Sequence, residues 1–209
     1  MASTSPLAAY PVDAPRKAGL DARHLRRCLG RFATGVTVVS YRSGGETRGV
    51  TVNSFTSVSL DPPLVLASIA RGAKAAVALR DASFTVNVLA ADQLDLAWTF
   101  AGRPVDGARV RWASRVGGVA HLRGAAAWFE CAPWEAIDAG DHVLFLGEVV
   151  AHDQRQVEPL LFQSGKFRAL GSELGAGSGR QADPMSWLQH RLHAERLTDD
   201  GARAVINQH

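Results

Sequence analysis

The sequence has little cysteine and no long apolar run. Only two cysteines, Cys28 and Cys131, occur among its 209 residues, too few for a disulfide scaffold. No stretch approaches the ~18 consecutive apolar residues of a membrane span, and the first residues lack the basic-then-apolar order of a signal peptide. We therefore expect two reduced thiols, a cytoplasmic location and no association with membranes.

Lysine is also scarce: Lys17, Lys74 and Lys166 are the only lysines among 23 basic residues. The formal net charge is +3, and no five basic residues follow one another. Because nucleic-acid binding depends on clustered positive charge, we expect no nucleic-acid partner. The apolar fraction of 46% excludes a chain that is disordered throughout.

The motifs of several enzyme classes are missing. The sequence contains neither the GxxxxGK[ST] nor the GxGxxG phosphate loop. It has no HExxH motif and no His/Cys cluster at the spacing of metal ligands. It also lacks the GxSxG motif that carries a nucleophilic serine. These absences disfavour kinases, zinc enzymes and hydrolases, and we expect no metal site.

The pattern along the chain predicts one mainly β domain between two tails. Residues 1–20 are expected to form a flexible arm. Residues 21–171 form the domain, and residues 172–209 read as a Gly- and Ser-rich linker followed by an amphipathic helical extension. Short strands at close spacing with few helices favour a barrel or sandwich over a doubly wound sheet.

The domain is predicted to begin with one helix. Asp21 is a candidate N-cap, and we expect the helix to close at Gly35. An apolar stripe at i, i+3, i+4 and i+7 lies between them: Leu25, Cys28, Leu29 and Phe32. Strands are then predicted over 36–41, 49–60, 64–69, 84–89, 121–131 and 142–151, and short helices over 74–80 and 92–100.

The segment 51–59 is uncharged, and six of its nine residues carry a hydroxyl or an amide. Strand alternation puts four of them on one face with Phe55: Thr51, Asn53, Ser57 and Ser59. A neutral surface of donors and acceptors suits a flat heteroaromatic ring with polar edges and a polyol tail. The alternative is an ordinary half-exposed strand, in which threonine is common.

Two further groups carry potential chemistry. Ser68, Arg71 and Lys74 follow a strand and open a short helix, an arrangement that suits a phosphate group, although a solvated helix start would look the same. Asp141 precedes His142 at the mouth of an apolar strand, where a histidine could contact a ligand or serve the fold alone.

Five segments of the chain carry a resemblance to a known family. They are FATGVTVV (32–39), GVTVNSFTSVSLDPPLV (49–65), FTVNVL (84–89) with Gln93, GDH (140–142) with GEV (147–149), and PLL (159–161) with Gly165. In this order, over roughly residues 22–170, they resemble the flavin reductase family built on the FMN-binding split barrel. The resemblance implies a split β-barrel with Greek-key-like order.

The resemblance also implies site residues. Phe84 and Asn87 are implied near the flavin, and His142 near the nicotinamide, with Phe167 on the same side where tyrosine is frequent in the family. The remaining implied flavin contacts run from the ring to the phosphate: Thr34, Val36, Thr51, Val52, Asn53, Ser54, Ser57, Val58, Ser59, Ser68, Arg71 and Lys74.

The activity implied by the resemblance is hydride transfer from NADH or NADPH to FMN or FAD. The chain would act as a homodimer that supplies reduced flavin to a separate monooxygenase. Two alternatives stay open. In one, the flavin remains tightly bound and reacts directly with an organic substrate. In the other, the protein binds flavin without catalysis.

Overall fold

The computed structural model describes residues 19–114 and 116–172. The chain divides into a unit of residues 1–170 and a unit of residues 171–209. Every helix and strand described lies in the first unit. The expected N-terminal arm, linker and helical extension fall almost entirely outside the described residues. None of the described helices is both long enough and apolar enough to cross a membrane.

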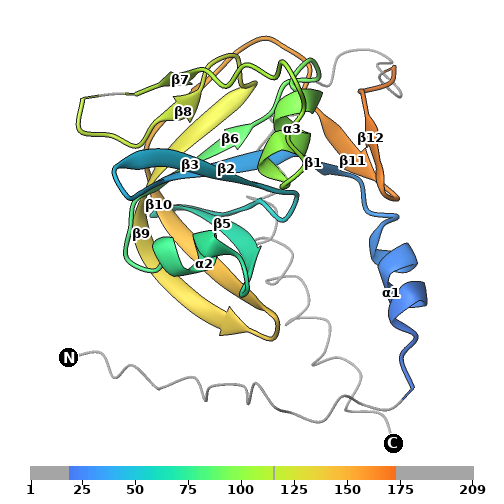
Figure 1. Cartoon of the computed structure of the whole chain (residues 1–209). Coiled ribbons are helices and arrows are strands. Elements are labelled where there is room, and N and C mark those ends of the chain that lie inside the picture. The colour runs from blue at the N-terminus through green and yellow to red at the C-terminus, as the bar shows by residue number, and fades with distance from the viewer. Residues whose placement is uncertain (1–18, 115, 173–209) are drawn as a thin grey trace, which may run out of the picture. The chain divides into compact units, whose positions relative to one another are not determined.

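The first unit is built on one antiparallel sheet of seven strands in the order β3-β2-β6-β9-β10-β5-β4, and it curves around a common interior (Figure 1). The mainly β fold with short helices is therefore confirmed. The strand bounds are Thr37–Ser43 (β2), Glu46–Val52 (β3), Thr56–Leu60 (β4), Pro63–Ala70 (β5), Phe84–Val88 (β6), Ala127–Ala139 (β9) and His142–Gln154 (β10).

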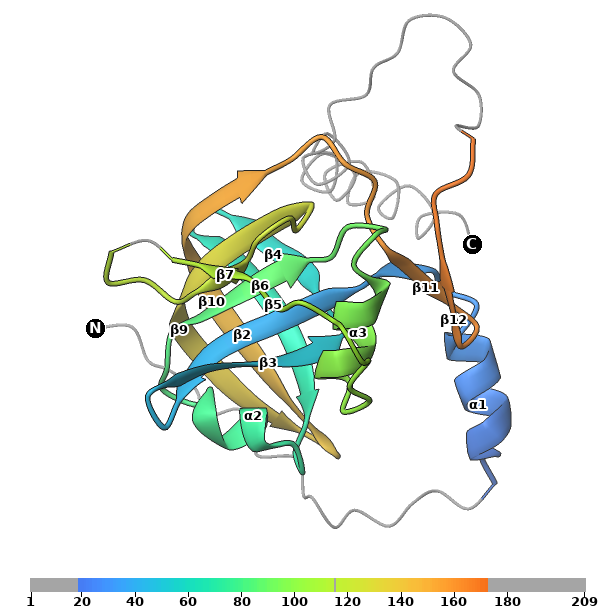
Figure 2. The ribbon, with the colours of Figure 1, turned by 45° about the horizontal axis from the view of Figure 1, so that its top comes forward.

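Short elements surround this sheet (Figure 2). The helices are Ala22–Leu29 (α1), Lys74–Ala78 (α2) and Leu94–Phe100 (α3). One three-stranded sheet consists of Thr34–Gly35 (β1), Leu161–Gln163 (β11) and Lys166–Arg168 (β12), and a two-stranded sheet consists of Trp112–Ala113 (β7) and His121–Leu122 (β8).

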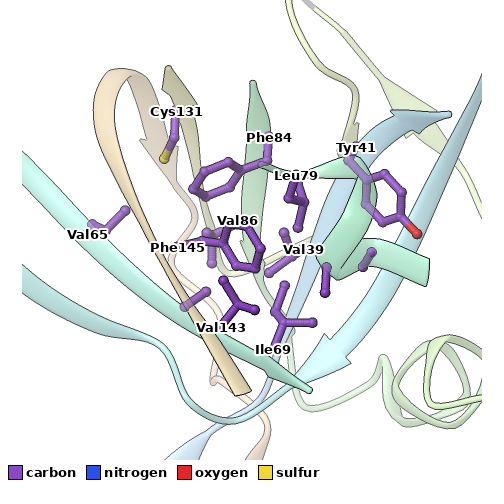
Figure 3. Packing of buried hydrophobic residues seen from close by; sticks show 13 residues of the cluster. Val39, Tyr41, Val65, Ile69, Leu79, Phe84, Val86, Cys131, Val143 and Phe145 are labelled. Atoms are coloured by element: carbon purple, nitrogen blue, oxygen red, sulfur yellow. The ribbon is translucent and has the colours of Figure 1, made fainter. Parts of the chain in front are cut away.

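The barrel interior is filled by alternate residues of the main sheet (Figure 3). On β10, Val143 and Phe145 are buried, whereas their neighbour Leu144 is only half-buried. Phe84 and Val86 of β6 pack against them together with Ile69 of β5. This period-2 burial is what one apolar face of a strand produces, and it positions β5, β6 and β10 around one core.

Gly147 permits the closest approach in this core. A Cβ atom at this position would lie 2.5 Å from Phe84 Cζ and 2.7 Å from Cys131 Cβ. Any side chain would therefore displace the Phe84 ring or strand β9. The neighbouring Cys131 is fully buried, and desolvation raises the pKa of its thiol to about 12.

A buried polar network ties three strands together around Asn87. Its Nδ2 donates to Val38 O at 2.8 Å and to Ser40 Oγ at 3.0 Å. Its Oδ1 accepts from Leu122 N at 2.7 Å. The Ser40 hydroxyl in turn donates to Ala120 O at 2.6 Å. Because each of these groups is removed from water, the amide of Asn87 stabilises the junction of β2, β6 and β8.

Two predicted elements differ from their patterns: the helix ends earlier, and one strand is interrupted. The helix begins as expected, with Asp21 Oδ1 accepting from Arg23 N at 2.8 Å, but it ends at Leu29 instead of Gly35. Ser164 donates to Gly30 O from both its N–H and its hydroxyl. The turn between β11 and β12 therefore binds the carbonyl group at the end of the helix. The predicted strand 121–131 is interrupted between β8 and β9.

We predict that Asn87→Ala lowers the free energy of unfolding by about 2–3 kcal/mol, because Leu122 N and Val38 O lose their buried partner. Urea denaturation measures the change. Asn53→Ala is the matched control, since Asn53 is exposed, and should cost less than about 1 kcal/mol. Equal losses in the two variants would contradict the assignment of Asn87 to the core.

Candidate functional site

Two cavities meet at Asn53 and Phe162, and together they form the candidate site. The smaller, here the aromatic cavity, has a volume of about 370 Å³ and is lined by Val36, Thr51, Val52, Asn53, Trp98, Ala101, Arg103, Phe162, Gly165 and Phe167. The larger, here the polar groove, has a volume of about 810 Å³ and is lined by Cys28, Leu29, Gly30, Phe32, Thr34, Asn53, Ser54, Phe55, Thr56, Phe162, Gln163 and Ser164.

The break between β3 and β4 creates this site. The sequence predicted one continuous strand over 49–60, but residues 53–55 leave strand conformation. β3 pairs with β2, and β4 pairs with β5, at opposite edges of the main sheet. The chain must cross from one edge to the other within these three residues, and Asn53 and Ser54 therefore turn into the cavities.

Ser54 joins the two edges of the barrel. Its hydroxyl donates to Ser68 O at 2.6 Å and accepts from Ser68 N at 3.1 Å. Thr51 is used in a similar way, since its Oγ1 donates to Ala97 O at 2.8 Å and ties β3 to α3. Both hydroxyls therefore hold the walls of the site together.

Asn53 offers a hydrogen-bonding group to a ligand at the junction of the cavities. Its Nδ2 donates to Thr34 Oγ1 at 3.2 Å, which fixes the amide plane. Among the described residues, none donates a hydrogen bond to Asn53 Oδ1. Its side chain is exposed, so this carbonyl oxygen can accept from a ring N–H of a ligand.

Three aromatic rings and one arginine form the wall of the aromatic cavity. The rings of Trp98 and Phe167 meet edge to face with centroids 5.0 Å apart, and those of Phe162 and Phe167 do so at 5.2 Å. The Arg103 guanidinium lies 5.2 Å from the Trp98 ring centroid. This wall suits a flat ring that stacks.

The sequence had indicated only part of this wall. Phe167 was expected on the nicotinamide side, but Trp98, Arg103 and Gly165 were not expected at the site. A signal for Trp98 was present in the predicted helix 92–100. Residues two positions apart on a helix point to nearly opposite sides, so Trp98 faces away from the core into which Leu96 is buried.

Ser57, Val58 and Ser59, which the resemblance implied as flavin contacts toward the ribityl and phosphate groups, line neither cavity. They lie on β4, where Ser57 and Val58 are exposed and Ser59 is half-buried. A bulge between Ser57 and Ser59 interrupts the regular alternation. They therefore continue from the end of the polar groove at Thr56 along an open edge strand.

Arg71 is committed to the fold. Its Nη1 donates to Asp138 Oδ1 at 2.8 Å, and its Nη2 donates to Gly140 O at 3.0 Å. Arg80 also binds Asp138, at 2.9 Å, and this hydrogen bond, together with Arg71, lowers the pKa of the Asp138 carboxyl. The guanidinium of Arg71 thus holds the β9–β10 hairpin, and we remove it from the expected phosphate site.

Lys74 and His142 lie apart from the two cavities. Lys74 lines a different cavity, with Tyr41 and Arg48. His142 lies opposite Ala70 on the outward face of the barrel, its Nδ1 2.7 Å from Asp141 Oδ1. Ser68 points to the same face two residues along. The described residues contain no group of three His, Cys, Asp or Glu side chains arranged to hold a metal.

Two other expected contacts are excluded by burial. Phe84 belongs to the barrel core, with only 1% of its surface exposed, and Asn87 has none exposed. The Phe84 side chain lies inside the barrel, and that of Asn87 lies on the opposite face of β6, where β8 covers it. Neither residue lines either cavity. We therefore correct their predicted place near a ligand.

Comparisons with known proteins agree on one family. The family model described as "Flavin reductase like domain" matches residues 29–171. A probable flavin reductase of Rhizobium meliloti is 42% identical over 70% of this chain, but the match spans only 48% of that protein. The FMN reductase (NADH) SmoA of Agrobacterium fabrum is 43% identical over 71% of this chain and 86% of its own.

Two further relatives extend this result. The reductase component of a flavin-dependent trigonelline monooxygenase from Acinetobacter baylyi is 40% identical over 74% of this chain and 47% of its own length. The solved structure of flavin reductase PheA2 in its native state has a TM-score of 0.69 and 40% identity, covering 73% of this chain and all of that one.

We predict that the native protein exposes one reactive thiol per chain. Cys28 is exposed, whereas Cys131 is buried with a pKa of about 12, which leaves roughly one thiolate in ten thousand at pH 8. Titration with a chromogenic disulfide reagent should count one thiol in the native protein and two after unfolding in guanidinium chloride. A second fast thiol in the native protein would show that the core at β9 is open.

Proposed function

The chain belongs to the flavin reductase family, and from that premise we propose that it transfers hydride from NADH or NADPH to FMN or FAD. The observation that supports this proposal most directly is that the two cavities adjoin, with Asn53 and Phe162 lining both of them. Hydride transfer requires two flat rings in contact, and two cavities that adjoin at the same residues place their occupants side by side at that junction. The related SmoA protein is an NADH-dependent FMN reductase by its name.

The polar groove suits the flavin. It is the larger of the two cavities, and neutral groups line it, including Thr34 Oγ1 and the Oδ1 of Asn53, which accepts no hydrogen bond from any described residue. Its end at Thr56 leads onto the exposed residues Ser57 and Val58, which we propose border the ribityl and phosphate groups together with Ser59. Because none of the described residues that line the groove is charged, the site favours neither redox state of the ring by charge.

The aromatic cavity suits the nicotinamide. Phe162 and Phe167 offer ring surfaces on which a single flat ring can stack. Thr51 and Val36 also line this cavity. The protein's own residues thus orient the donor and exclude water, while the bound flavin supplies the redox chemistry. The mechanism needs no general acid or base, and the described walls of the two cavities present no carboxylate or histidine.

We further propose that reduced flavin leaves the protein and serves a separate monooxygenase. The trigonelline relative is by its name the reductase component of a flavin-dependent monooxygenase. The polar groove is open toward the edge strand β4, where Ser57 and Val58 face solvent. An open groove favours exchange of the flavin over permanent retention.

A homodimer is part of this proposal. Helix α1 and the residues directly after it expose apolar side chains, with Leu29 66% and Phe32 77% exposed. The outward face of the barrel adds Ile137 and the half-buried Leu144 next to His142. A second copy that covers such surfaces would bury apolar area, and a contact of His142 with the nicotinamide is proposed for that dimer. The two free cysteines support the cytoplasmic location.

The first experiment is NAD(P)H oxidation in air by purified protein, with and without added FMN or FAD. Strong stimulation by free flavin is expected for a reductase of diffusible flavin. Oxidation without added flavin would instead indicate a tightly bound group that acts on an organic substrate. Flavin binding without any oxidation would identify a non-catalytic flavin-binding protein and overturn the proposal.

We predict that Asn53→Ala raises the Kd for FMN by roughly 2- to 13-fold, the loss of one hydrogen bond worth about 0.5–1.5 kcal/mol. Quenching of flavin fluorescence measures the Kd. Gln154→Ala is the matched control, because Gln154 is an exposed amide at the far end of β10 and should leave the Kd unchanged. An unchanged Kd for Asn53→Ala would remove this amide from the flavin site.

We also predict that FMN slows the alkylation of Cys28. This thiol lines the polar groove, so a flavin bound there should lower the rate of reaction with iodoacetamide several-fold. NADH alone should leave the rate unchanged, because Cys28 is not part of the aromatic cavity. Protection by NADH but not by FMN would show that the assignment is reversed, with the nicotinamide in the polar groove and the flavin in the aromatic cavity.

A further inference from the structure

We propose that Arg103 binds the pyrophosphate of the reduced nicotinamide dinucleotide at the mouth of the aromatic cavity, and so determines the preference for a phosphorylated hydride donor. The inference rests on the proposed function, because that function places the nicotinamide in this cavity. It assigns a specificity role to a residue that the sequence had not indicated.

The end of helix α3 places Arg103 against Trp98. Gly102 adopts a φ of +81°, a left-handed conformation that glycine tolerates best. Its N–H donates to Thr99 O at 3.2 Å, and the Arg103 N–H donates to Trp98 O at 3.0 Å. These two bonds form a Schellman motif, in which the residue after the glycine contacts the residue three positions before the helix cap. Here that contact is the guanidinium over the indole ring.

The charge of Arg103 is available to a ligand. The side chain is exposed, and in the part of the chain that the structure describes, no carboxylate lies within ion-pair distance of it. Stacking on Trp98 holds the guanidinium plane in place without occupying its N–H donors. A guanidinium held in this way can bind phosphate oxygens with two parallel hydrogen bonds at little further entropic cost.

The position of Arg103 favours the pyrophosphate of the donor over the phosphate of the flavin. Arg103 lines the aromatic cavity and not the polar groove. The β4 strand, along which the flavin tail is proposed to run, begins at Thr56 in the polar groove, on the other side of the junction at Asn53 and Phe162. In a nicotinamide dinucleotide only one ribose lies between the ring and the pyrophosphate, so a ring stacked on Phe167 places that group near the cavity mouth.

Arg71 provides an instructive contrast. It was the arginine expected at a phosphate, yet Asp138 and Gly140 O occupy its donors. Arg103 has no such partner among the described residues. Of these two arginines, it is Arg103 that combines a free charge with a place on the wall of a cavity.

The test measures NADH binding and turnover in Arg103→Ala. We expect a roughly tenfold rise in both the Kd for NADH, from NADH fluorescence without flavin, and the KM for NADH, with kcat within about twofold. The backbone bonds of the Schellman motif remain, so the variant should fold. Arg103→Lys should recover part of the loss. Arg42→Ala is the matched control, since Arg42 is an exposed arginine whose contact is Gly45 O, and its constants should stay at wild-type values.

Two pairs of ligands identify which phosphate is bound. With 1-benzyl-1,4-dihydronicotinamide, which has no phosphate, Arg103→Ala should match the wild-type kcat/KM. With NADH, the variant should show the same tenfold loss whether the acceptor is FMN or riboflavin. A loss that disappears with riboflavin would assign Arg103 to the flavin phosphate and overturn the proposal. An equal loss with both donors, or no loss with NADH, would also overturn it.

Failure of the proposed function gives a different result. A wild-type protein that oxidises no NADH with any flavin would contradict reductase activity. The fluorescence Kd still decides the role of Arg103 in that case, because it needs no turnover. A tenfold weaker Kd in Arg103→Ala but not in Arg42→Ala would support the assignment, and equal Kd values, or no NADH binding by the wild-type protein, would overturn it.

Discussion

The closure of one sheet onto itself is the constraint on which the rest of this structure depends. Strands β3 and β4 are consecutive in the chain but lie at opposite edges of the seven-stranded sheet. Residues 53–55 therefore have to cross between the edges, and regular pairing stops there. The Ser54 hydroxyl joins the edges by bonding both backbone groups of Ser68. Both cavities open at this crossing, so the geometry that completes the barrel also creates the site.

Residues of one type take different roles according to where the fold puts them. Asn53 and Asn87 are both amides on predicted strands, yet Asn53 is exposed at the junction of two cavities and Asn87 is a buried link between three strands. Arg71 and Arg103 differ in the same way. Asp138 and Gly140 hold the first. Trp98 supports the second from one side, and no described carboxylate pairs with it. Burial and partners decide function here more than residue type does.

The two cavities divide the chemistry of the site. The groove that we assign to the flavin combines neutral hydroxyl and amide groups with the rings of Phe32, Phe55 and Phe162. The cavity that we assign to the hydride donor adds the Trp98 and Phe167 rings and the Arg103 guanidinium. In the reaction that we propose, the protein contributes stacking, orientation and exclusion of water, while the ligands contribute the redox chemistry. This division explains why the sequence carries none of the motifs for acid–base or metal catalysis.

Local features of the sequence determined much of the fold. The Asp21 cap predicted α1, the β-branched runs predicted most of the main strands, and the polar segment 51–59 predicted the region of the site. The order of the five matching segments along the chain predicted the family. These signals depend on neighbours within a few residues. Only the tertiary structure decided that the strand 49–60 breaks, that Ser164 ends α1 at Gly30, and that Phe84 and Asn87 are buried. It alone brought Trp98, Arg103, Phe162 and Phe167 together, because these contacts join residues far apart in the chain, and only the closed sheet determines which of them meet.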